Sequence, residues 1–133
     1  MVIQSTIDAR RALDYLSSRP EIDTARIGVV GYSMGGMIGL YLSALETALT
    51  AVVACAVPTT LQPLPNDHFN FAARARTPTL LMIGRNDWLS SPEDAETLLR
   101  FLPQESELFF YESGHVLPAQ FASDAAAWLI SRL

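Results

Sequence analysis

A serine, an aspartate and a histidine of this chain have the residue types and the order along the sequence that nucleophilic catalysis needs. Ser33 is the centre of a Gly-x-Ser-x-Gly motif, and Asp87 and His115 each follow an apolar run in a glycine-containing segment. A serine hydroxyl becomes an effective nucleophile when an imidazole takes its proton. A carboxylate holds that imidazole in the correct tautomer and stabilises the imidazolium that forms. We therefore predict Ser33 as the nucleophile, His115 as the base and Asp87 as the acid that orients the base.

The motif around Ser33 lies between two apolar runs of different character. Residues 27–30 are short and mostly β-branched, as in a buried strand, whereas residues 37–42 are longer and mostly unbranched, as in a helix. A Gly-x-Ser-x-Gly motif at a strand-to-helix turn is typical of a nucleophile elbow. We expect a Cβ at either Gly31 or Gly35 to clash with the neighbouring strand or helix. The alternative is a turn whose serine caps the helix without doing chemistry.

The composition indicates one domain, residues 1–133, with enough apolar residues for a buried sheet. Half of the residues are hydrophobic, and the net charge is −5. This negative charge, with no basic cluster, argues against binding to nucleic acid or to an anionic membrane surface. Lysine is absent from the chain, which excludes a Ser–Lys dyad and a lysine Schiff base.

The single cysteine, Cys55, lies in an apolar run and is expected to be an inert core residue. One cysteine cannot form an intrachain disulfide, so we expect a reducing, cytoplasmic location. One cysteine and two widely separated histidines form no metal-ligand pattern, and we predict neither a metal nor a cofactor. The chain shows no signal-peptide pattern and no apolar stretch long enough to span a bilayer.

Apolar runs and helical patterns alternate along the whole chain. This alternation predicts an α/β fold, an open parallel four-stranded sheet with helices on both faces. The predicted strands are residues 26–31, 51–56, 79–84 and 108–111, and the predicted helices are residues 3–19, residues 34–46, a helix that begins at Ser91-Pro92, and a last helix whose inward face holds Phe121, Ala125, Trp128 and Leu129.

Ser33, Asp87 and His115 each follow one of these strands. Right-handed crossovers place the carboxyl ends of parallel strands at one edge of a sheet, which is where ligands bind in such folds. The order Ser, Asp, His is also the α/β-hydrolase order. Taken alone, Asp87 is consistent with a turn-capping residue and His115 with a surface histidine, but their common placement favours a shared site.

Four other polar residues receive no catalytic role. Asp67 and His68 lie in a polar, proline-broken segment and are expected at the surface. Glu112 is expected to face solvent or a neighbouring arginine. Asp124 is expected to be solvated on the last helix.

Three segments, residues 26–36, 79–87 and 113–115, resemble the α/β-hydrolases of the group that contains dienelactone hydrolases, acetyl xylan esterases and prolyl-oligopeptidase-type peptidases. The resemblance implies the roles already given to the three residues and adds the backbone N–H of Met34 as an oxyanion-hole donor. Dienelactone hydrolases proper have cysteine as the nucleophile, so a serine at this position favours an esterase-like enzyme.

The resemblance also implies a truncated fold, because members of this group usually have several strands before the helix at residues 3–19. Those strands carry the loop that supplies the second oxyanion donor, which here would have to come from a partner subunit or from residues 58–77. Their absence would leave the strand at residues 26–31 as an unpaired edge. We therefore expect a homodimer or higher oligomer with the first strand or the first helix at the contact.

These observations predict a serine carboxylesterase-type hydrolase that cleaves small, short-acyl esters through an acyl-enzyme on Ser33. The segment between the second and third strands is short, so a large lid over the site is not expected. We expect Tyr32 and Trp88 to line the substrate site, although a packing role for Trp88 fits the sequence equally well. The alternatives are a peptidase or an acyl transferase of the same fold, or a non-catalytic fragment or scaffold module of a larger hydrolase.

Overall fold

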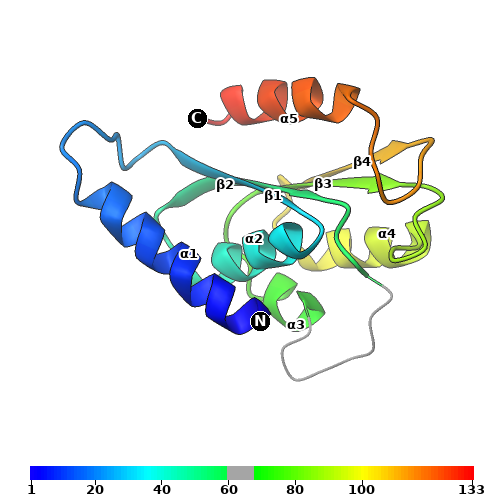
Figure 1. Cartoon of the computed structure of the whole chain (residues 1–133), viewed down its shortest axis with the longest axis horizontal. Coiled ribbons are helices and arrows are strands. Elements are labelled where there is room, and N and C mark those ends of the chain that lie inside the picture. Colours follow the sequence, from blue (N-terminus) through cyan, green and yellow to red (C-terminus); the bar gives the residue numbers. More distant parts are fainter. Residues whose placement is uncertain (60–67) are drawn as a thin grey trace.

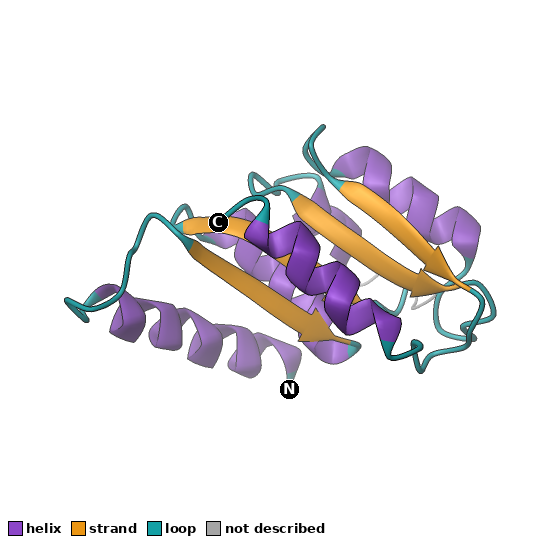
Figure 2. Cartoon of the chain, turned by 90° about the horizontal axis from the view of Figure 1, so that it is seen from above, coloured by secondary structure: helices purple, strands orange, loops and turns teal. Residues whose placement is uncertain are grey.

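Four strands form one parallel sheet in the order β1-β2-β3-β4. The computed structural model describes residues 1–59 and 68–133. In Figure 2 the strand arrows point the same way, which confirms the predicted parallel α/β fold. The strands are β1 (Ile27–Tyr32), β2 (Leu49–Cys55), β3 (Thr79–Gly84) and β4 (Glu107–Tyr111).

The strand boundaries follow the sequence pattern with small differences. The third strand, β3, has the bounds that its apolar run predicts. The second strand, β2, begins earlier than predicted, at Leu49, because Leu49 pairs with Ile27 at the start of β1. A register irregularity between Ile27 and Gly28 accommodates this extra pair.

The helices cover both faces of the sheet, as predicted. Figure 1 shows α5 alone on one side of the sheet and the other helices on the opposite side. The short helix α3 was not predicted, because its segment reads as an irregular loop in the sequence. The helices are α1 (Val2–Ser17), α2 (Met34–Leu45), α3 (His68–Ala72), α4 (Pro92–Phe101) and α5 (Gln120–Ile130).

The start of α4 shows why this segment is helical. Ser91 is the N-cap residue, and its hydroxyl accepts a hydrogen bond from the backbone N–H of Asp94 at 3.0 Å. Pro92 occupies the first turn, where a missing N–H costs nothing. Acidic side chains in the same turn stabilise the positive end of the helix dipole. These features confirm the helix start predicted from the sequence.

Alternate residues of the central strands pack into different halves of the core. In β3, Leu81 packs with Leu98 of α4, whereas Met82 packs with Trp128 of α5. All six residues of β3 are buried, as an apolar run in a two-sided sheet requires. The edge strand β1 is less protected, and 55% of Val30 is exposed. The sheet therefore has a fully buried centre and an open edge at β1.

Candidate active site

Ser33 lies between the end of β1 and the start of α2, in a backbone conformation that is rare for a residue with a side chain. Its φ and ψ are 54° and −114°. The turn is held on both sides, because the Ser33 N–H donates to the Cys55 carbonyl at 2.8 Å and the Ser33 carbonyl accepts from the Met37 N–H at 3.2 Å. This strained turn is the local geometry that the sequence motif predicted.

Two glycines near Ser33, Gly31 and Gly36, permit close packing. The motif itself pointed to Gly31 and Gly35. A Cβ on Gly31 would lie 2.0 Å from the carbonyl oxygen of Gly35. A Cβ on Gly35 would have no atom within 4 Å, so the prediction of a clash there is wrong. The close contact belongs instead to Gly36, whose added Cβ would lie 2.8 Å from Val57. The first turn of α2 thus approaches β1 through Gly31 and β2 through Gly36.

The side chains of Ser33, His115 and Asp87 form a continuous chain of hydrogen-bond contacts. The Ser33 Oγ lies 3.0 Å from Nε2 of His115, and Nδ1 of the same ring lies 2.9 Å from Oδ2 of Asp87. The Asp87 side chain is fully buried, whereas 23% of the His115 side chain is exposed. With the ring proton on Nδ1 donated to Asp87, Nε2 is free to accept the hydroxyl proton of Ser33.

The loops that carry Asp87 and His115 are also joined through their backbones. Oδ1 of Asp87 accepts a hydrogen bond from the Leu89 N–H at 2.9 Å, so both carboxylate oxygens have a partner. The Asn86 N–H donates to the Ser113 carbonyl at 2.9 Å. The last residue of β3, Gly84, lies against this second loop so closely that an added Cβ would be 2.2 Å from the Gly114 carbonyl oxygen.

The residues predicted to line the substrate site lie beside His115. The Trp88 ring centroid is 6.5 Å from that of His115, and 76% of Trp88 is exposed. Val116, which follows His115 in the chain and received no role from the sequence, is 80% exposed. The signal available for Val116 was an apolar residue directly after the candidate base. Tyr32 is partly buried, and its hydroxyl contacts the backbone of the histidine loop.

Met34 is the first residue of α2. Its backbone N–H donates to no acceptor among the residues that the structure describes. The N-terminus of a helix favours negative charge, so this N–H is well placed to receive a developing oxyanion.

The remaining polar predictions have mixed outcomes. Glu112 pairs with Arg85 at 3.1 Å, which confirms the expected arginine partner. Asp124 was expected to be solvated, but it accepts a hydrogen bond from the Tyr111 hydroxyl at 2.7 Å, and the expectation is wrong. Burial and this hydrogen bond raise the pKa of Tyr111. Asp67 and the side chain of His68 lie outside the described residues.

Cys55 is fully buried, as predicted for a core residue. Burial raises the pKa of its thiol to about 11. Within residues 1–59 and 68–133, no group of three or more His, Cys, Asp or Glu side chains could hold a metal ion. In the same residues, no helix has the combined length and apolar character needed to cross a bilayer.

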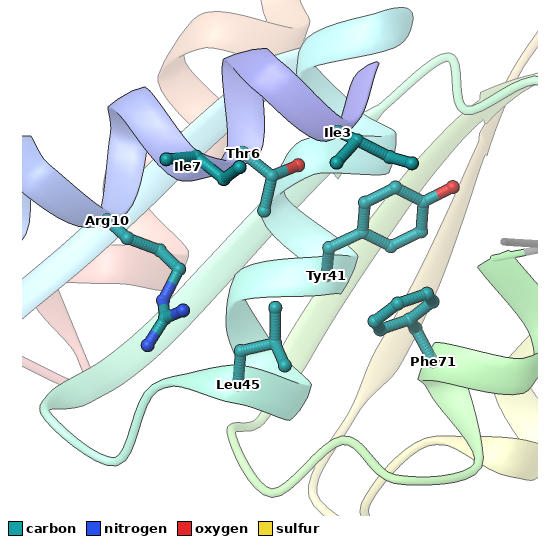
Figure 3. Close-up of a pocket in the computed structure, with 7 residues that line it drawn as sticks. All are labelled: Ile3, Thr6, Ile7, Arg10, Tyr41, Leu45 and Phe71. Carbon is teal, nitrogen blue, oxygen red and sulfur yellow. The ribbon is translucent and has the colours of Figure 1, made fainter.

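Two cavities lie away from Ser33. The first, of about 240 Å³, opens between α1, α2 and α3, and its mostly apolar lining is drawn in Figure 3. The second, of about 390 Å³, lies between β4 and the start of α5 and includes Glu112 and Asp124. Neither cavity is lined by Ser33, Asp87 or His115.

The parallel sheet, the elbow and the Ser-Asp-His order define the class of protein as an α/β-hydrolase. Solved structures agree at the level of fold. An acetyl xylan esterase from Paenibacillus sp. R4 matches with a TM-score of 0.86 and 21% identity over 98% of this chain and 52% of the other. An esterase from Pyrococcus furiosus matches with a TM-score of 0.81 and 22% identity over 96% of this chain and 61% of the other.

Sequence comparison gives the family. The model of the FSH1 serine hydrolase family matches residues 4–125, and the chain therefore belongs to this family. A short segment of 36 residues is 56% identical to the α/β hydrolase domain-containing protein WAV2 of Arabidopsis thaliana, covering 27% of this chain and 12% of that protein. The chain thus spans about half the length of the acetyl xylan esterase, and its aligned segment is a small part of the plant protein.

Proposed function

We propose that this serine hydrolase is a carboxylesterase that cleaves small, short-acyl esters, with Ser33 as nucleophile, His115 as general base and acid, and Asp87 as the group that orients His115. One observation carries the proposal. Both ring nitrogens of His115 lie within 3.0 Å of the partners that this chemistry needs, the Ser33 Oγ and the Asp87 Oδ2.

The reaction begins when Ser33 Oγ attacks the carbonyl carbon of the ester and its proton passes to Nε2 of His115. Asp87 stabilises the imidazolium through Nδ1. The tetrahedral intermediate collapses when the bond to the alcohol oxygen breaks and His115 returns the proton to that oxygen. Water, deprotonated by His115, then attacks the acyl-enzyme, and Ser33 leaves with the proton as the carboxylic acid is released.

The backbone N–H of Met34 donates to the oxyanion in this proposal. It is the amide that follows the nucleophile, and the start of α2 adds the positive end of the helix dipole. Removal of one such donor costs roughly 3–4 kcal/mol of transition-state stabilisation in other serine hydrolases, so this single amide has a large share of the catalysis.

Two exposed apolar side chains support the choice of substrate. Trp88 and Val116 are each directly next to a residue of the hydrogen-bonded chain, and both present most of their surface to solvent. Apolar side chains beside a catalytic histidine favour the binding of an acyl or alkyl group over water. Two such side chains provide apolar surface for a short acyl group, so we infer short-acyl esters as the substrates.

The proposal is tested by reaction of the protein with p-nitrophenyl acetate and butyrate, together with a fluorophosphonate probe. We expect Ser33→Ala to lose at least about a thousandfold in kcat/KM, since removal of the nucleophile leaves only binding and oxyanion stabilisation. Intact-mass analysis should find one phosphonyl adduct on the native chain and none on Ser33→Ala.

A second serine provides the matched control. Ser123 is exposed on α5, and its hydroxyl donates a hydrogen bond to the Gln120 carbonyl of its own helix. Ser123→Ala should keep native turnover and native labelling. Equal hydrolysis by the native protein and Ser33→Ala, or an adduct on another residue, would contradict the assignment.

A further inference from the structure

The hydroxyl of Tyr32 makes two hydrogen bonds with the loop that carries His115. It donates to the His115 carbonyl oxygen at 2.7 Å and accepts from the Leu117 N–H at 2.8 Å. These two backbone groups lie on either side of Val116, so one hydroxyl holds three consecutive residues of the loop. The donor of the hydroxyl and one of its acceptor sites are occupied by protein backbone.

Tyr32 is the residue directly before Ser33, at the end of β1. The histidine loop follows β4, and β2 and β3 lie between these two strands in the sheet. The loop therefore extends along the rim of the sheet to reach the elbow. The side chain of Tyr32 therefore links this loop to the residue directly before the nucleophile.

The ring of Tyr32 is held in place as well. It meets the His115 ring edge-on at a centroid distance of 6.2 Å and the Phe121 ring of α5 at 5.5 Å. Such perpendicular contacts are favourable for aromatic rings. The ring position is thus set by α5 and the histidine loop, and the hydroxyl position follows from it.

The other end of the histidine loop is held independently. The Asn86 N–H bonds to the Ser113 carbonyl, before His115 in the chain, whereas the two Tyr32 bonds lie at and after His115. Among the described residues, the Tyr32 hydroxyl is the hydrogen-bond partner of the backbone at His115 and Leu117. His115, whose Nε2 lies 3.0 Å from Ser33 Oγ, is in this part of the loop.

We propose that Tyr32 is a positioning residue, whose hydroxyl sets the placement of His115 against Ser33 by bridging the His115 carbonyl and the Leu117 amide. This inference rests on the proposed hydrolase function, and it differs from the expectation that Tyr32 lines the substrate site. A substrate contact would act on binding, whereas a positioning contact acts on proton transfer within the bound complex.

Tyr32→Phe tests the inference, because it removes the hydroxyl and keeps the ring. For p-nitrophenyl acetate we expect kcat to fall by about tenfold to a hundredfold, as for a small displacement of a catalytic group, while KM changes by less than about twofold. The rate of fluorophosphonate labelling of Ser33 should fall by a similar factor. A rise in KM with unchanged kcat, or native kinetics, would overturn the inference.

Tyr111→Phe is the matched control. It also removes a tyrosine hydroxyl, which donates to Asp124 of α5 and, among the described residues, makes no hydrogen bond to the histidine loop. It should leave kcat and KM at native values. An equal loss of kcat in both variants would show that any hydroxyl removal has this effect, and would overturn a specific role for Tyr32.

A second measurement separates this inference from the proposed function, because it needs no activity. In Tyr32→Phe the Leu117 amide loses its acceptor, so its hydrogen exchange should accelerate by at least about tenfold. The Asn86 amide, bonded to Ser113, should exchange at the native rate. Unchanged exchange at Leu117 would overturn the inference even in an active enzyme, whereas an inactive native protein with accelerated Leu117 exchange would contradict only the hydrolase proposal.

Discussion

Ser33 has an energetically unfavourable backbone conformation, and hydrogen bonds to neighbouring residues stabilise it. A φ of 54° in a residue with a side chain costs on the order of 1–3 kcal/mol. The hydrogen bonds from Ser33 to β2 and within α2 offset this cost. The packing at Gly31 is equally strict, because the next turn of the chain passes within 2.0 Å of the position that a Cβ would take. The motif therefore contains glycines of unequal importance.

Two alanine variants measure this difference. Gly31→Ala should destabilise the protein by about 1–3 kcal/mol or more, because its Cβ meets a backbone carbonyl that cannot move freely. Gly35→Ala should be neutral or more stable by about 0.5–1 kcal/mol, since Gly35 is helical, has open space at the Cβ position and does not adopt a positive φ. Urea unfolding of both variants provides the values. Similar destabilisation in both would contradict this view of the elbow.

At the scale of elements, the site is assembled from the ends of β1, β3 and β4. Each strand end contributes one polar side chain, and the loops after β3 and β4 are joined by backbone hydrogen bonds. Gly84 lies at the centre of this junction, where the carbonyl oxygens of Ser113 and Gly114 approach it at 2.5 Å and 2.2 Å from an added Cβ. We therefore expect the distance between Asp87 and His115 to depend on the close packing at Gly84.

Gly84→Ala should move the histidine loop away from β3. We expect a loss of esterase activity of roughly a hundredfold, the scale of a displacement of about 1 Å in a catalytic group. Gly114→Ala is the matched control in the same junction, because its nearest neighbour would be the Asn86 carbonyl oxygen at an ordinary 3.6 Å. Steady-state kinetics with p-nitrophenyl acetate compare the two. Equal activity in both variants would show that this contact does not set the geometry.

At the scale of the whole molecule, the sheet has two edge strands, β1 and β4, and each has a neighbour on one side only. The central strands β2 and β3 are largely buried, whereas 55% of Val30 on β1 is exposed. The helix α1, which lies near β1 in Figure 2, also exposes Ile3 and Tyr15. Unpaired strand edges with apolar side chains favour association.

The sequence predicts a homodimer or higher oligomer through the first strand or the first helix, and we propose that two copies of the chain associate through β1. Sedimentation at micromolar concentration should then show a dimer, and Val30→Lys should shift it to the monomer, because a charge at an edge strand opposes pairing. Ile130→Lys changes an apolar residue on α5 that is even more exposed than Val30, and it should leave the dimer intact. A native protein that sediments as a monomer would contradict the proposal.

Two weakly acidic groups in the core, the Cys55 thiol and the Tyr111 hydroxyl, make the stability of the whole molecule depend on pH in the alkaline range. Burial raises the pKa of Cys55 to about 11, and the pKa of Tyr111 in the same core cluster is also raised. The folded state therefore holds these protons more tightly than the unfolded state. Their contribution to stability is complete below the unfolded thiol pKa, about 8.5, and is lost as the pH rises through the folded value.

We expect the free energy of unfolding to decrease between about pH 8.5 and pH 11, and Cys55→Ala to reduce the slope of that decrease. Chemical unfolding at a series of pH values measures both. Tyr111 continues to titrate in this variant, so some slope should remain. An identical slope in native protein and Cys55→Ala would show that the thiol makes no contribution.

The sequence alone determined the types of elements, their order and the strand ends that carry Ser33, Asp87 and His115. These features follow from neighbouring residues, such as the apolar run of β3 and the cap at Ser91, and local patterns need no knowledge of distant contacts. The short helix α3 was missed because it is only five residues long and lies within residues 58–76, a stretch that several prolines interrupt just before the helix. Parallel topology then placed the strand ends at one rim.

Only the tertiary structure decided which atoms meet at that rim. Tyr32 and His115 are 83 positions apart, and no local pattern shows that the hydroxyl of one holds the backbone of the other. The same holds for the contact between Gly84 and the histidine loop, for the Tyr111 partner of Asp124 and for the free space beside Gly35. Such contacts depend on the distance between elements after packing, which the spacing of residues along the chain does not contain.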